Sequence, residues 1–371
     1  MRVLLLSAYA AQSHLQWQRN LQAMFDDWQW RVLTLPPRHF SWRVRGNPLY
    51  WALEQRQLLE EEHDLLLATS MVDLATLRGL VPGLGQLPAA LYFHENQFAY
   101  PEYGERPGLL EAQMVSLYGA LAADAVLFNS AYNRESFLEG CDELLRRLPD
   151  YTPADCVSLL REKSRVLPVP LALSAIPALA ARWPGRPGVY PSRPLRLVWS
   201  ARFEHDKGGD RLYAALRALE RRELDYEVAL TGQQFRRAPR VFDDIPRDFG
   251  HRVVHTGYLE SRAAYLSLLR GADVVLSTAL HEFQGLAVLE AVAAGCLPAV
   301  PERQAYPEIY PAAFRYRCHP DVDVEAGAAA DLVAGLAAKL ERGRVAPPDV
   351  SAYDCEALRA AYAALFEQLA G

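Results

Sequence analysis

Short apolar runs alternate along most of the chain with stretches in which apolar residues recur every three or four positions. The runs have the length of buried strands, and the longer stretches have the spacing of helices that bury one face. This alternation predicts an α/β protein with mainly parallel sheets. The expected strands are Val3–Leu6, Val32–Leu35, Leu65–Ala68, Ala90–Phe93, Ala125–Phe128 and Ser164–Pro168, followed by Leu195–Ser200, Tyr226–Leu230, Val253–Thr256 and Ala272–Ser277.

A proline-rich stretch divides this pattern in two. Residues 168–194 contain seven prolines, a density that opposes both helix and sheet. At 371 residues, the chain fits two domains better than one. We therefore predict a first doubly wound lobe over residues 1–170, a linker over 171–194, a second lobe over 195–350 and a closing helix over 351–371. Ligands of such lobes bind at the carboxyl ends of the strands.

The main candidate site lies in the second lobe, between a strand and a helix. The segment Ser277–Glu290 (STALHEFQGLAVLE) leads from a strand into a helix expected to begin near Gly285. Free N–H groups and the positive end of the helix dipole favour a phosphate there. Glu282 and Glu290 flank this anion site, an arrangement that suits a sugar nucleotide. The alternative is two surface glutamates on an ordinary βα unit.

Two cations follow the first strand of the second lobe. Arg202 and Lys207 stand five residues apart, before a glycine pair at the expected start of a helix. Cations in this position can hold a diphosphate and neutralise the charge that grows on a leaving group. A solvated turn is the alternative, and the nearby Glu282 loop makes it the weaker one.

Polar residues also follow two strands of the first lobe. Ser13 and His14 come after the first strand, and His94, Glu95 and Asn96 come after the fourth. Strands of a parallel sheet end at the same edge, where an imidazole can contact a donor sugar or steady a proton. A polar turn and a structural histidine are the alternatives.

Cationic and aromatic residues are interleaved between Arg38 and Arg56. The cluster contains Arg38, His39, Phe40, Trp42, Arg43, Arg45, Tyr50, Trp51 and Arg56, with Glu54 as its one acid. Such a mixture suits single-stranded RNA, whose phosphates need charge and whose splayed bases need stacking platforms. The net charge of −6 argues against a general nucleic-acid coat, so the cluster is local. Amphipathic residues that cover a lobe face are the alternative.

The cysteines and the apolar runs predict the cellular compartment of the protein. The five cysteines are scattered and show neither a CxxC pair nor a His/Cys metal spacing. This predicts a reducing cytoplasm and no structural zinc. The first apolar run, Val3–Leu6, is too short for a signal peptide or a membrane span, so no membrane association is expected. Nothing in the sequence implies a protein partner.

The four charged residues of the second lobe carry a family resemblance. Arg202, Lys207 and the pair Glu282 and Glu290, with seven residues between the two acids, resemble the retaining glycosyltransferases of the two-lobed GT-B type. The resemblance implies two Rossmann-like lobes that face each other across a cleft. It also implies that Arg202 and Lys207 hold the donor diphosphate. By the same resemblance, Glu282 touches the donor sugar and Glu290 holds the ribose.

Two loops complete the implied donor site. Phe283, Gly285 and Leu286 stand where such enzymes have a loop whose amides meet sugar and phosphate, and Gln284 departs from that pattern in detail. Gly257, Tyr258 and Leu259 match a loop that contacts the nucleobase, mostly through its backbone. Ser13 and His14 match a donor-contacting position in the first lobe.

Sequence blocks of the first lobe narrow the resemblance. They are Ser13-His14, Leu35–Arg43 (LPPRHFSWR), Tyr92–Gln97 (YFHENQ) with Tyr100-Pro101, and Phe128–Ser130, joined by Trp199–Lys207 and Tyr306–Pro311 (YPEIYP) of the second lobe. Together they resemble the tRNA-queuosine mannosyltransferase family. This implies transfer of mannose from GDP-mannose to the cyclopentene-diol of queuosine in the anticodon loop of a tRNA, aspartate tRNA in the familiar members. The implied acceptor-binding residues are Arg38, His39, Trp42, Arg43, Arg45, Glu95 and Asn96.

One position departs from that family. Ala10-Ala11-Gln12 stands where the family has a Gly-Gly pair, and glycines there allow a close approach of backbone to ligand. The alanines therefore leave a different pose of donor or acceptor open.

The expected reaction proceeds with retention and without a metal or another cofactor. The acceptor attacks on the face that the phosphate leaves, and the departing diphosphate accepts the acceptor's proton. His94 serves this step together with Glu282, Arg202 and Lys207. The alternatives are the same donor machinery with another nucleotide sugar or with a glycan, lipid or small-molecule acceptor, a sugar-nucleotide epimerase, and an idle binding module.

Overall fold

The computed structural model of the chain describes residues 1–99, 108–234 and 238–371. Tyr100 and Pro101, which belong to one of the family blocks, lie outside these ranges. The chain divides into two compact units. The first consists of Met1–Leu171 together with Cys355–Gly371, and the second consists of Ala172–Asp354.

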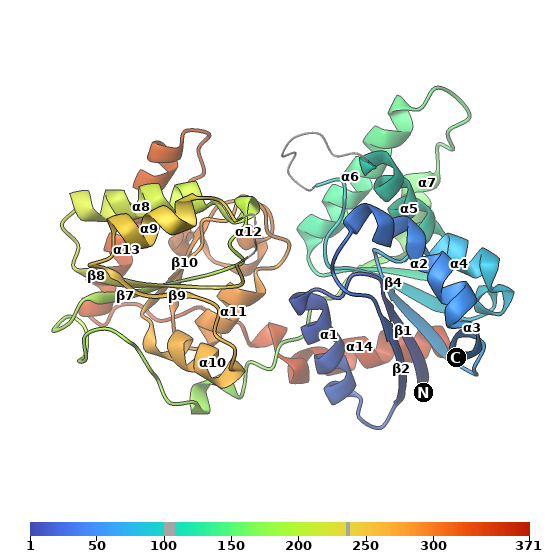
Figure 1. The fold of residues 1–371 in the computed structure, drawn as a ribbon, viewed down its shortest axis with the longest axis horizontal. Helices are drawn as coiled ribbons and strands as arrows, with labels where there is room; N and C mark the ends of the chain where they lie inside the picture. The colour runs from blue at the N-terminus through green and yellow to red at the C-terminus, as the bar shows by residue number, and fades with distance from the viewer. Residues whose placement is uncertain (100–107, 235–237) are drawn as a thin grey trace. The chain divides into compact units, whose positions relative to one another are not determined.

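The first unit is built on a parallel sheet with the strand order β2-β1-β3-β4-β5-β6 (Figure 1). Leu5 of β1 pairs with Val32 of β2 on one side and with Leu67 of β3 on the other. Strands β3 and β4 are buried along their whole length, as expected for a sheet with helices on both faces. The strands are β1 Arg2–Ser7, β2 Gln29–Thr34, β3 Leu65–Thr69, β4 Ala89–Phe93, β5 Ala125–Phe128 and β6 Ser164–Val166.

Helices cover both faces of this sheet. On one face α1 contacts α14, and on the other α2, α4 and α5 pack together (Figure 1). The contact of α14 is specific: Trp17 Nε1 donates to the Tyr362 hydroxyl at 3.2 Å, and that hydroxyl donates to the Pro168 carbonyl at 2.9 Å. The helices are α1 Gln12–Met24, α2 Phe40–Glu54, α3 Arg56–Leu59, α4 Leu74–Leu80, α5 Leu109–Ala122, α6 Ala131–Arg147, α7 Cys156–Lys163 and α14 Cys355–Ala370, with a 3-10 turn η1 at Pro82–Gly85.

The second unit repeats this architecture with the strand order β12-β11-β10-β7-β8-β9. Helices α8, α9 and α13 lie on one face of its sheet, and α10 and α11 lie on the other (Figure 1). The strands are β7 Leu195–Ser200, β8 Tyr226–Thr231, β9 Val253–Gly257, β10 Val274–Leu276, β11 Leu297–Pro301 and β12 Arg315–Tyr316. The helices are α8 Gly209–Arg221, α9 Val241–Asp248, α10 Arg262–Gly271, α11 Leu286–Ala293, α12 Tyr306–Ile309 and α13 Val322–Glu341, with 3-10 turns η2 Ile176–Ala178, η3 His205–Lys207, η4 Ala312–Phe314 and η5 Ser351–Tyr353.

Two strands of the second sheet were not predicted from the sequence. β11 (LPAVP) contains Pro298 and Pro301, and proline argues against a strand because it has no N–H to donate. β12 spans two residues, Arg315 and Tyr316. Two residues are too few to show the alternation of apolar and polar positions that predicts a strand. The ten predicted strands are present, with ends shifted by up to three residues.

The proline-rich stretch packs against the second unit. The Arg182 amide donates to the Ser267 carbonyl at 2.9 Å, and Trp183 Nε1 donates to Glu227 Oε2 at 2.8 Å. The buried Glu227 carboxylate also accepts from the Arg186 amide at 2.9 Å. Polar contacts therefore hold part of the predicted linker, residues 171–194, on the second unit, to which the chain belongs from Ala172 onward.

The described residues contain neither a candidate membrane-spanning helix nor a cluster of metal ligands. No helix in the described ranges combines the length and hydrophobicity needed to cross a bilayer. Within residues 1–99, 108–234 and 238–371, no three His, Cys, Asp or Glu side chains stand close enough together to hold a metal ion.

Candidate active site

The predicted site in the second unit forms where two neighbouring strands end. β7 and β10 lie side by side in the sheet, so the loops that follow them meet. The Leu280 and His281 amides both donate to the Asp206 carbonyl, at 2.8 and 3.1 Å. Gly208 makes this approach possible, because its φ is +68° and a Cβ there would lie 2.0 Å from the Thr278 carbonyl oxygen.

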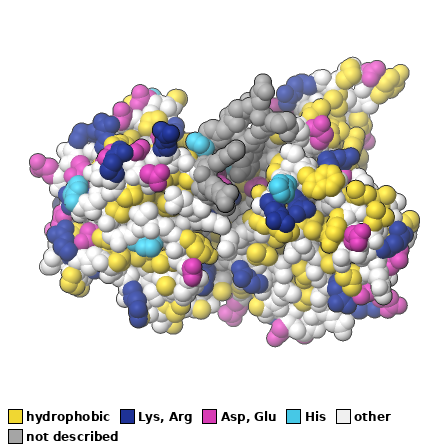
Figure 2. Space-filling view, in the orientation of Figure 1, with side chains coloured by type: hydrophobic (Ala, Val, Ile, Leu, Met, Phe, Trp, Pro, Cys, Tyr) yellow, Lys and Arg dark blue, Asp and Glu magenta, His cyan; other side chains and the backbone are white. Residues whose placement is uncertain are grey.

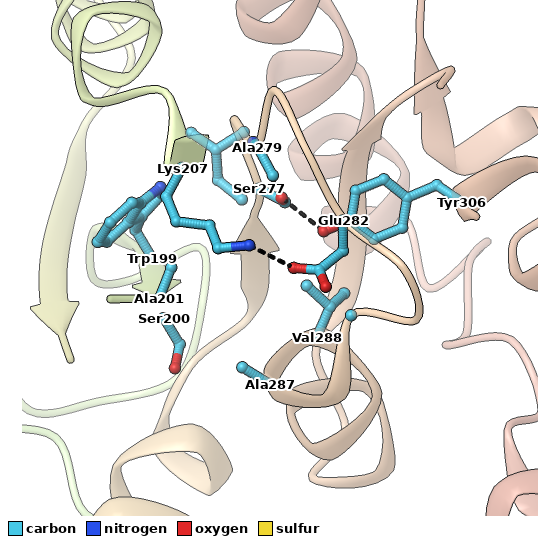
Figure 3. A pocket seen from close by; sticks show the side chains of 12 residues that line it. Trp199, Ser200, Ala201, Lys207, Ser277, Ala279, Glu282, Ala287, Val288 and Tyr306 are labelled. Carbon is cyan, nitrogen blue, oxygen red and sulfur yellow. Dashed lines mark hydrogen bonds and ion pairs between the residues drawn. The ribbon is translucent and has the colours of Figure 1, made fainter. Parts of the chain in front are cut away.

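Lys207 and Glu282 are brought into contact by these loops. Lys207 Nζ lies 3.1 Å from Glu282 Oε2 (Figure 3). It also lies 3.1 Å from Asp206 Oδ2 and 2.9 Å from the His281 carbonyl oxygen. The lysine side chain is 11% exposed and the Glu282 side chain 25%. The ammonium is thus fixed by three oxygens, while part of the Glu282 carboxylate stays open to the pocket.

The charges of Lys207, Asp206 and Glu282 stabilise one another. Burial alone would raise the pKa of Glu282, but the Lys207 ammonium outweighs burial and the pKa is lowered. The pKa of the Asp206 carboxyl is also lowered, again because Lys207 overcomes the effect of burial. Both carboxylates are therefore ionised at neutral pH.

Gly285 and Tyr306 shape the wall of the pocket. Gly285 caps α11 with a φ of +75°, and a Cβ there would lie 2.9 Å from Tyr306 Cε1. The Tyr306 hydroxyl is 2.7 Å from Ser277 Oγ, which holds the ring in place (Figure 3). The pocket is lined by Trp199, Ser200, Ala201, Lys207, Leu276, Ser277, Ala279, Glu282, Gly285, Ala287, Val288 and Tyr306.

Arg202 and Glu290 were predicted for this site and do not belong to the pocket lining. Arg202 Nη2 lies 3.1 Å from Glu204 Oε2, and the arginine side chain is 40% exposed. Burial raises the pKa of the Glu204 carboxyl. The Glu290 carboxylate is buried and bound by both terminal nitrogens of Arg262, a partner that the sequence did not suggest.

The loop predicted to meet the nucleobase ends strand β9, two strands away from β7. Gly257 has a φ of +112°, and its carbonyl accepts from the Gly232 amide at 3.2 Å. Tyr258 is about half exposed, and Leu259 is half-buried. Phe283 is buried beside His281, with ring centroids 4.4 Å apart, and Leu286 is the first residue of α11. The donor roles of these residues stay predictions.

His14 and His94 form a buried pair in the first unit. Their rings stack with centroids 4.1 Å apart, and Trp17 meets the His94 ring edge-on at 4.9 Å. Burial, together with the neighbouring His14, lowers the pKa of His94 well below its usual value, so this imidazole is neutral at pH 7. Among the described residues, His94 Nε2 has no hydrogen-bond partner. Ser13 is half-buried on the same helix, α1.

Asn96 does not fit its predicted role in acceptor binding. Its side chain is buried, and Nδ2 donates to Asn133 Oδ1 at 2.8 Å. Its Oδ1 accepts from the Phe98 and Ala99 amides at 3.0 and 2.9 Å. The side chain therefore fastens the turn after β4. Glu95, next to it, is half-buried.

The cationic and aromatic cluster is exposed at the start of α2. Arg38 and His39 are exposed, and so are Phe40 and Trp42, at 36% and 57%. Hydrophobic side chains gather beside Lys, Arg and His side chains over α2 and α4 (Figure 2). Trp51, which the sequence had included, belongs to the core.

Two arginines of the cluster have partners within the first unit. Arg43 Nε donates to the Pro36 carbonyl at 3.3 Å. Arg45 Nη1 lies 2.7 Å from Oδ2 of the buried Asp73. Their side chains therefore stabilise the turn before α2 and the contact between α2 and α4.

Gln304 is a site residue that sequence reasoning missed. Its Oε1 accepts from the Glu282 amide, and its Nε2 lies 2.8 Å from His281 Nδ1. It has a φ of +54°, which few residues other than glycine adopt. A polar residue just after a strand is the signal that could have predicted Gln304. That signal was missed because β11, which contains two prolines, was not predicted as a strand.

Two solved structures share this fold along nearly the whole chain. Sucrose-phosphate synthase from Thermosynechococcus elongatus superposes with a TM-score of 0.68 at 16% identity, and the match covers 100% of this chain and 99% of that chain. HepE from Anabaena, solved in complex with UDP, gives a TM-score of 0.64 at 14% identity over 99% of this chain and 100% of that one. The fold is therefore GT-B, with two Rossmann-like units, as predicted.

Sequence comparisons define the class and then the family. Residues 188–331 match the model of group 1 glycosyl transferases, so the chain is a glycosyltransferase. Residues 2–171 match the model of the N-terminal part of tRNA-queuosine alpha-mannosyltransferases. The tRNA-queuosine alpha-mannosyltransferase of Drosophila melanogaster is 33% identical over 312 residues, which cover 83% of this chain and 81% of that protein. The chain belongs to the tRNA-queuosine alpha-mannosyltransferase family.

A further relative shares a shorter region. The GDP-mannose-dependent alpha-(1-6)-phosphatidylinositol dimannoside mannosyltransferase of Mycobacterium tuberculosis is 35% identical over 117 residues, which cover 31% of this chain and 29% of that protein.

Replacing Gly285 with alanine is expected to displace the Tyr306 ring and to destabilise the fold by about 1–2 kcal/mol. The positive φ disfavours a Cβ, and the added carbon meets the Tyr306 ring. Thermal and urea unfolding measure the effect. The control is Gly335→Ala, in α13, where a Cβ meets nothing within 4 Å. Unchanged stability of the Gly285 variant would contradict the prediction.

Proposed function

We propose that this chain transfers mannose from GDP-mannose to the cyclopentene-diol of queuosine in the anticodon loop of tRNA(Asp), with retention of configuration. The observation that carries the proposal is the contact between Lys207 and Glu282 at the pocket of the second unit. Similarity to the Drosophila relative supports mannose and queuosine. Similarity to the mycobacterial relative, whose name includes GDP-mannose, supports the donor.

The Lys207 ammonium connects donor binding to orientation of the sugar. It has three donors, and oxygens of Asp206, His281 and Glu282 surround it. A diphosphate that enters the pocket competes with Glu282 for this ammonium. The exchange frees the Glu282 carboxylate to accept from hydroxyls of the sugar. Arg202 adds a second cation once it leaves Glu204.

Transfer then takes place on one face of the sugar. The bond between the anomeric carbon and the phosphate oxygen breaks, and the queuosine hydroxyl forms the new bond on the same face. The departing phosphate oxygen takes the proton of that hydroxyl. Lys207 and the amides at the start of α11 stabilise the charge that grows on the diphosphate. The cations do the work here that a metal ion does in other transferases.

The direct test uses purified protein, GDP-mannose and tRNA with or without queuosine. After digestion, mass spectrometry of the nucleosides is expected to show a hexose on queuosine and none on the unmodified tRNA. UDP-glucose and UDP-galactose serve as competing donors, and tRNAs for other amino acids serve as competing acceptors. Binding of GDP-mannose without transfer to queuosine would overturn the acceptor assignment, and absence of binding would overturn the donor assignment.

We propose that the exposed start of α2 contacts the tRNA. Trp42→Ala is expected to weaken tRNA affinity by about 10-fold or more, because an exposed indole offers a stacking platform for a base. Arg38→Ala is expected to reduce the salt slope of binding by about 1. Fluorescence anisotropy with labelled tRNA at several salt concentrations measures both. Tyr151→Ala, at a fully exposed tyrosine of the same unit, is the control. Unchanged affinity in the Trp42 variant would place the RNA elsewhere.

We propose a reducing cytoplasm as the setting of this reaction. All five cysteines are free thiols, and Cys141, Cys156 and Cys296 are buried. Free buried thiols are typical of proteins from reducing compartments.

A further inference from the structure

The loop that carries Glu282 is held between two other loops of the second unit. Strand β10 lies between β7 and β11 in the sheet, so the loop after β10 has a neighbouring loop on each side. On the β7 side, the Asp206 carbonyl accepts from the His281 amide at 3.1 Å. On the β11 side, Oε1 of Gln304 accepts from the Glu282 amide. The backbone of the Glu282 loop is therefore fixed from both sides, and on the β11 side by a side chain.

Gln304 combines a strained backbone with a side chain that is used at both ends. Its φ is +54°, in the left-handed region that glycine adopts without strain. Its Oε1 binds the Glu282 amide, and its Nε2 lies 2.8 Å from His281 Nδ1. Glycine would suit this backbone better, but it would remove both contacts. A strained residue with such contacts indicates a role at the neighbouring site.

The Glu282 amide determines the orientation of the Gln304 side chain. A peptide N–H donates, so the amide oxygen of Gln304 has to face it. The NH2 group of Gln304 then faces the buried His281 ring at Nδ1. Because the NH2 group is a donor, Nδ1 has to be an unprotonated acceptor. The contact therefore selects the neutral tautomer of His281 that carries its proton on Nε2.

The same stretch of backbone places the Glu282 carboxylate. Its Oε1 accepts from the Phe283 amide at 3.2 Å, and its Oε2 lies 3.1 Å from Lys207 Nζ. The His281 carbonyl accepts from the same ammonium at 2.9 Å. A backbone shift of about 1 Å would take these contacts out of hydrogen-bond range. The position of the carboxylate in the pocket thus depends on how firmly the loop is held.

The turn that contains Gln304 also supplies part of the pocket wall. Tyr306 lies two residues further along, and its amide donates to the Arg303 carbonyl at 3.2 Å. Its hydroxyl is 2.7 Å from Ser277 Oγ, and its ring lines the pocket. The turn from β11 into α12 therefore connects the Glu282 loop to the wall opposite β7.

We propose that Gln304 is a positioning residue for the transfer reaction. It fixes the Glu282 backbone and the tautomer of His281, and through them the place of the Glu282 carboxylate in the pocket. The inference rests on the proposed function for its kinetic test, whereas its geometry rests on contacts within the second unit. Gln304 acts through Glu282 and needs no contact of its own with the substrate.

The kinetic test replaces Gln304 with glycine, which relieves the backbone and removes the side chain. The kcat is expected to fall by about 10- to 100-fold, because Glu282 loses its fixed position. The melting temperature is expected to stay within about 5 °C of the wild type, because relief of the backbone offsets the lost hydrogen bonds. The KM for GDP-mannose is expected to change less than kcat. Gln304→Glu still accepts from the Glu282 amide and is expected to keep kcat within about 5-fold of the wild type.

The matched control is Glu223→Gly. Glu223 has a φ of +55° and is exposed between α8 and β8, outside the pocket lining. The substitution relieves the backbone in the same way and removes no side chain from the site. It is expected to keep kcat and to leave the melting temperature unchanged or slightly higher.

The second test observes the His281 ring directly and needs no turnover. Nitrogen NMR of protein with isotope-labelled histidine distinguishes protonated from unprotonated ring nitrogens, and His281→Asn identifies the resonances by their loss. The wild type is expected to have an unprotonated Nδ1. In Gln304→Glu the carboxylate can only accept, so Nδ1 is expected to carry a proton.

Three outcomes would overturn the inference. One is a Gln304→Gly variant with the full kcat of a wild type that adds a hexose to queuosine. The second is a Gln304→Glu variant as slow as Gln304→Gly, since the bond to the Glu282 amide would then not matter. The third is a proton on His281 Nδ1 in the wild type. Failure of the proposed function shows separately, as absence of a modified nucleoside, and the NMR measurement still tests the contact of Gln304 with His281.

Discussion

Glu282→Ala is expected to lower kcat by about 10²- to 10³-fold while the protein stays folded. The carboxylate is ionised, lies in the pocket and faces the ammonium that is proposed to meet the diphosphate. Its loss removes an acceptor for the sugar hydroxyls at the position where bonds change. Steady-state kinetics with saturating GDP-mannose and queuosine tRNA measure the effect, and circular dichroism checks the fold.

Two further variants sharpen this prediction. Glu282→Gln keeps the shape of the side chain without the charge, so it separates the need for a carboxylate from the need for an acceptor oxygen. Glu260→Gln, at an exposed glutamate of the same unit, is expected to leave the rate unchanged. A full rate in Glu282→Ala would remove this residue from the catalytic group.

Lys207→Met is expected to lower kcat/KM by about 10³-fold and the free energy of unfolding at pH 7 by about 3–5 kcal/mol. The variant leaves the carboxylates of Asp206 and Glu282 without the cation that holds both pKa values down. It also removes the charge proposed to stabilise the leaving diphosphate. Urea unfolding measures the stability, and steady-state kinetics measure the transfer.

The pH dependence of that loss has a defined sign. In the wild type, carboxylates with lowered pKa values contribute stability that is present above their ordinary values of 3.8 and 4.5 and is lost as the pH falls through the lowered values. The variant lacks this contribution. The difference in free energy of unfolding between the wild type and Lys207→Met is therefore expected to be largest at neutral pH and to shrink below about pH 4. Lys339→Met, at an exposed lysine of α13, is the control. A difference in free energy of unfolding that grows as the pH falls would contradict the ion-pair explanation.

The pattern of apolar residues predicted the strands that bury both faces. Leu65–Ala68 and Ala90–Phe93 are unbroken apolar runs because helices cover these strands on both sides. β11 was missed because two prolines occupy it. The general α/β architecture follows from local sequence, whereas a strand that carries prolines needs the whole sheet to define it.

The candidate site was predictable in part. Lys207 and Glu282 follow strands that the sequence predicts, and the structure brings them within 3.1 Å. Their contact depends on β7 and β10 being neighbours although β8 and β9 lie between them in sequence. Such an order is a property of the folded sheet, which local spacing does not specify.

Side-chain partners were the part that sequence could not supply. In the sequence, Asn96 has the position of a polar residue at a ligand-binding edge. In the structure, its side chain instead forms hydrogen bonds with Asn133 and with the turn after β4. Arg262 carries no motif, yet it binds Glu290 from another helix. Which polar residue meets a ligand and which meets its neighbour depends on distances between elements far apart in the chain.

The position of α14 has a consequence for the order in which the protein is made. The first unit lacks the partner of Trp17 until Tyr362 has left the ribosome, whereas the second unit is continuous from Ala172 to Asp354. At a synthesis rate of about 5–20 residues per second, the first unit remains without α14 for a time on the order of 10 s or more. We therefore expect the later-made unit to complete its fold before the earlier-made one. A nascent chain arrested before residue 355 would expose the apolar groove that Phe366 and Tyr362 fill, which makes it a natural client for a chaperone.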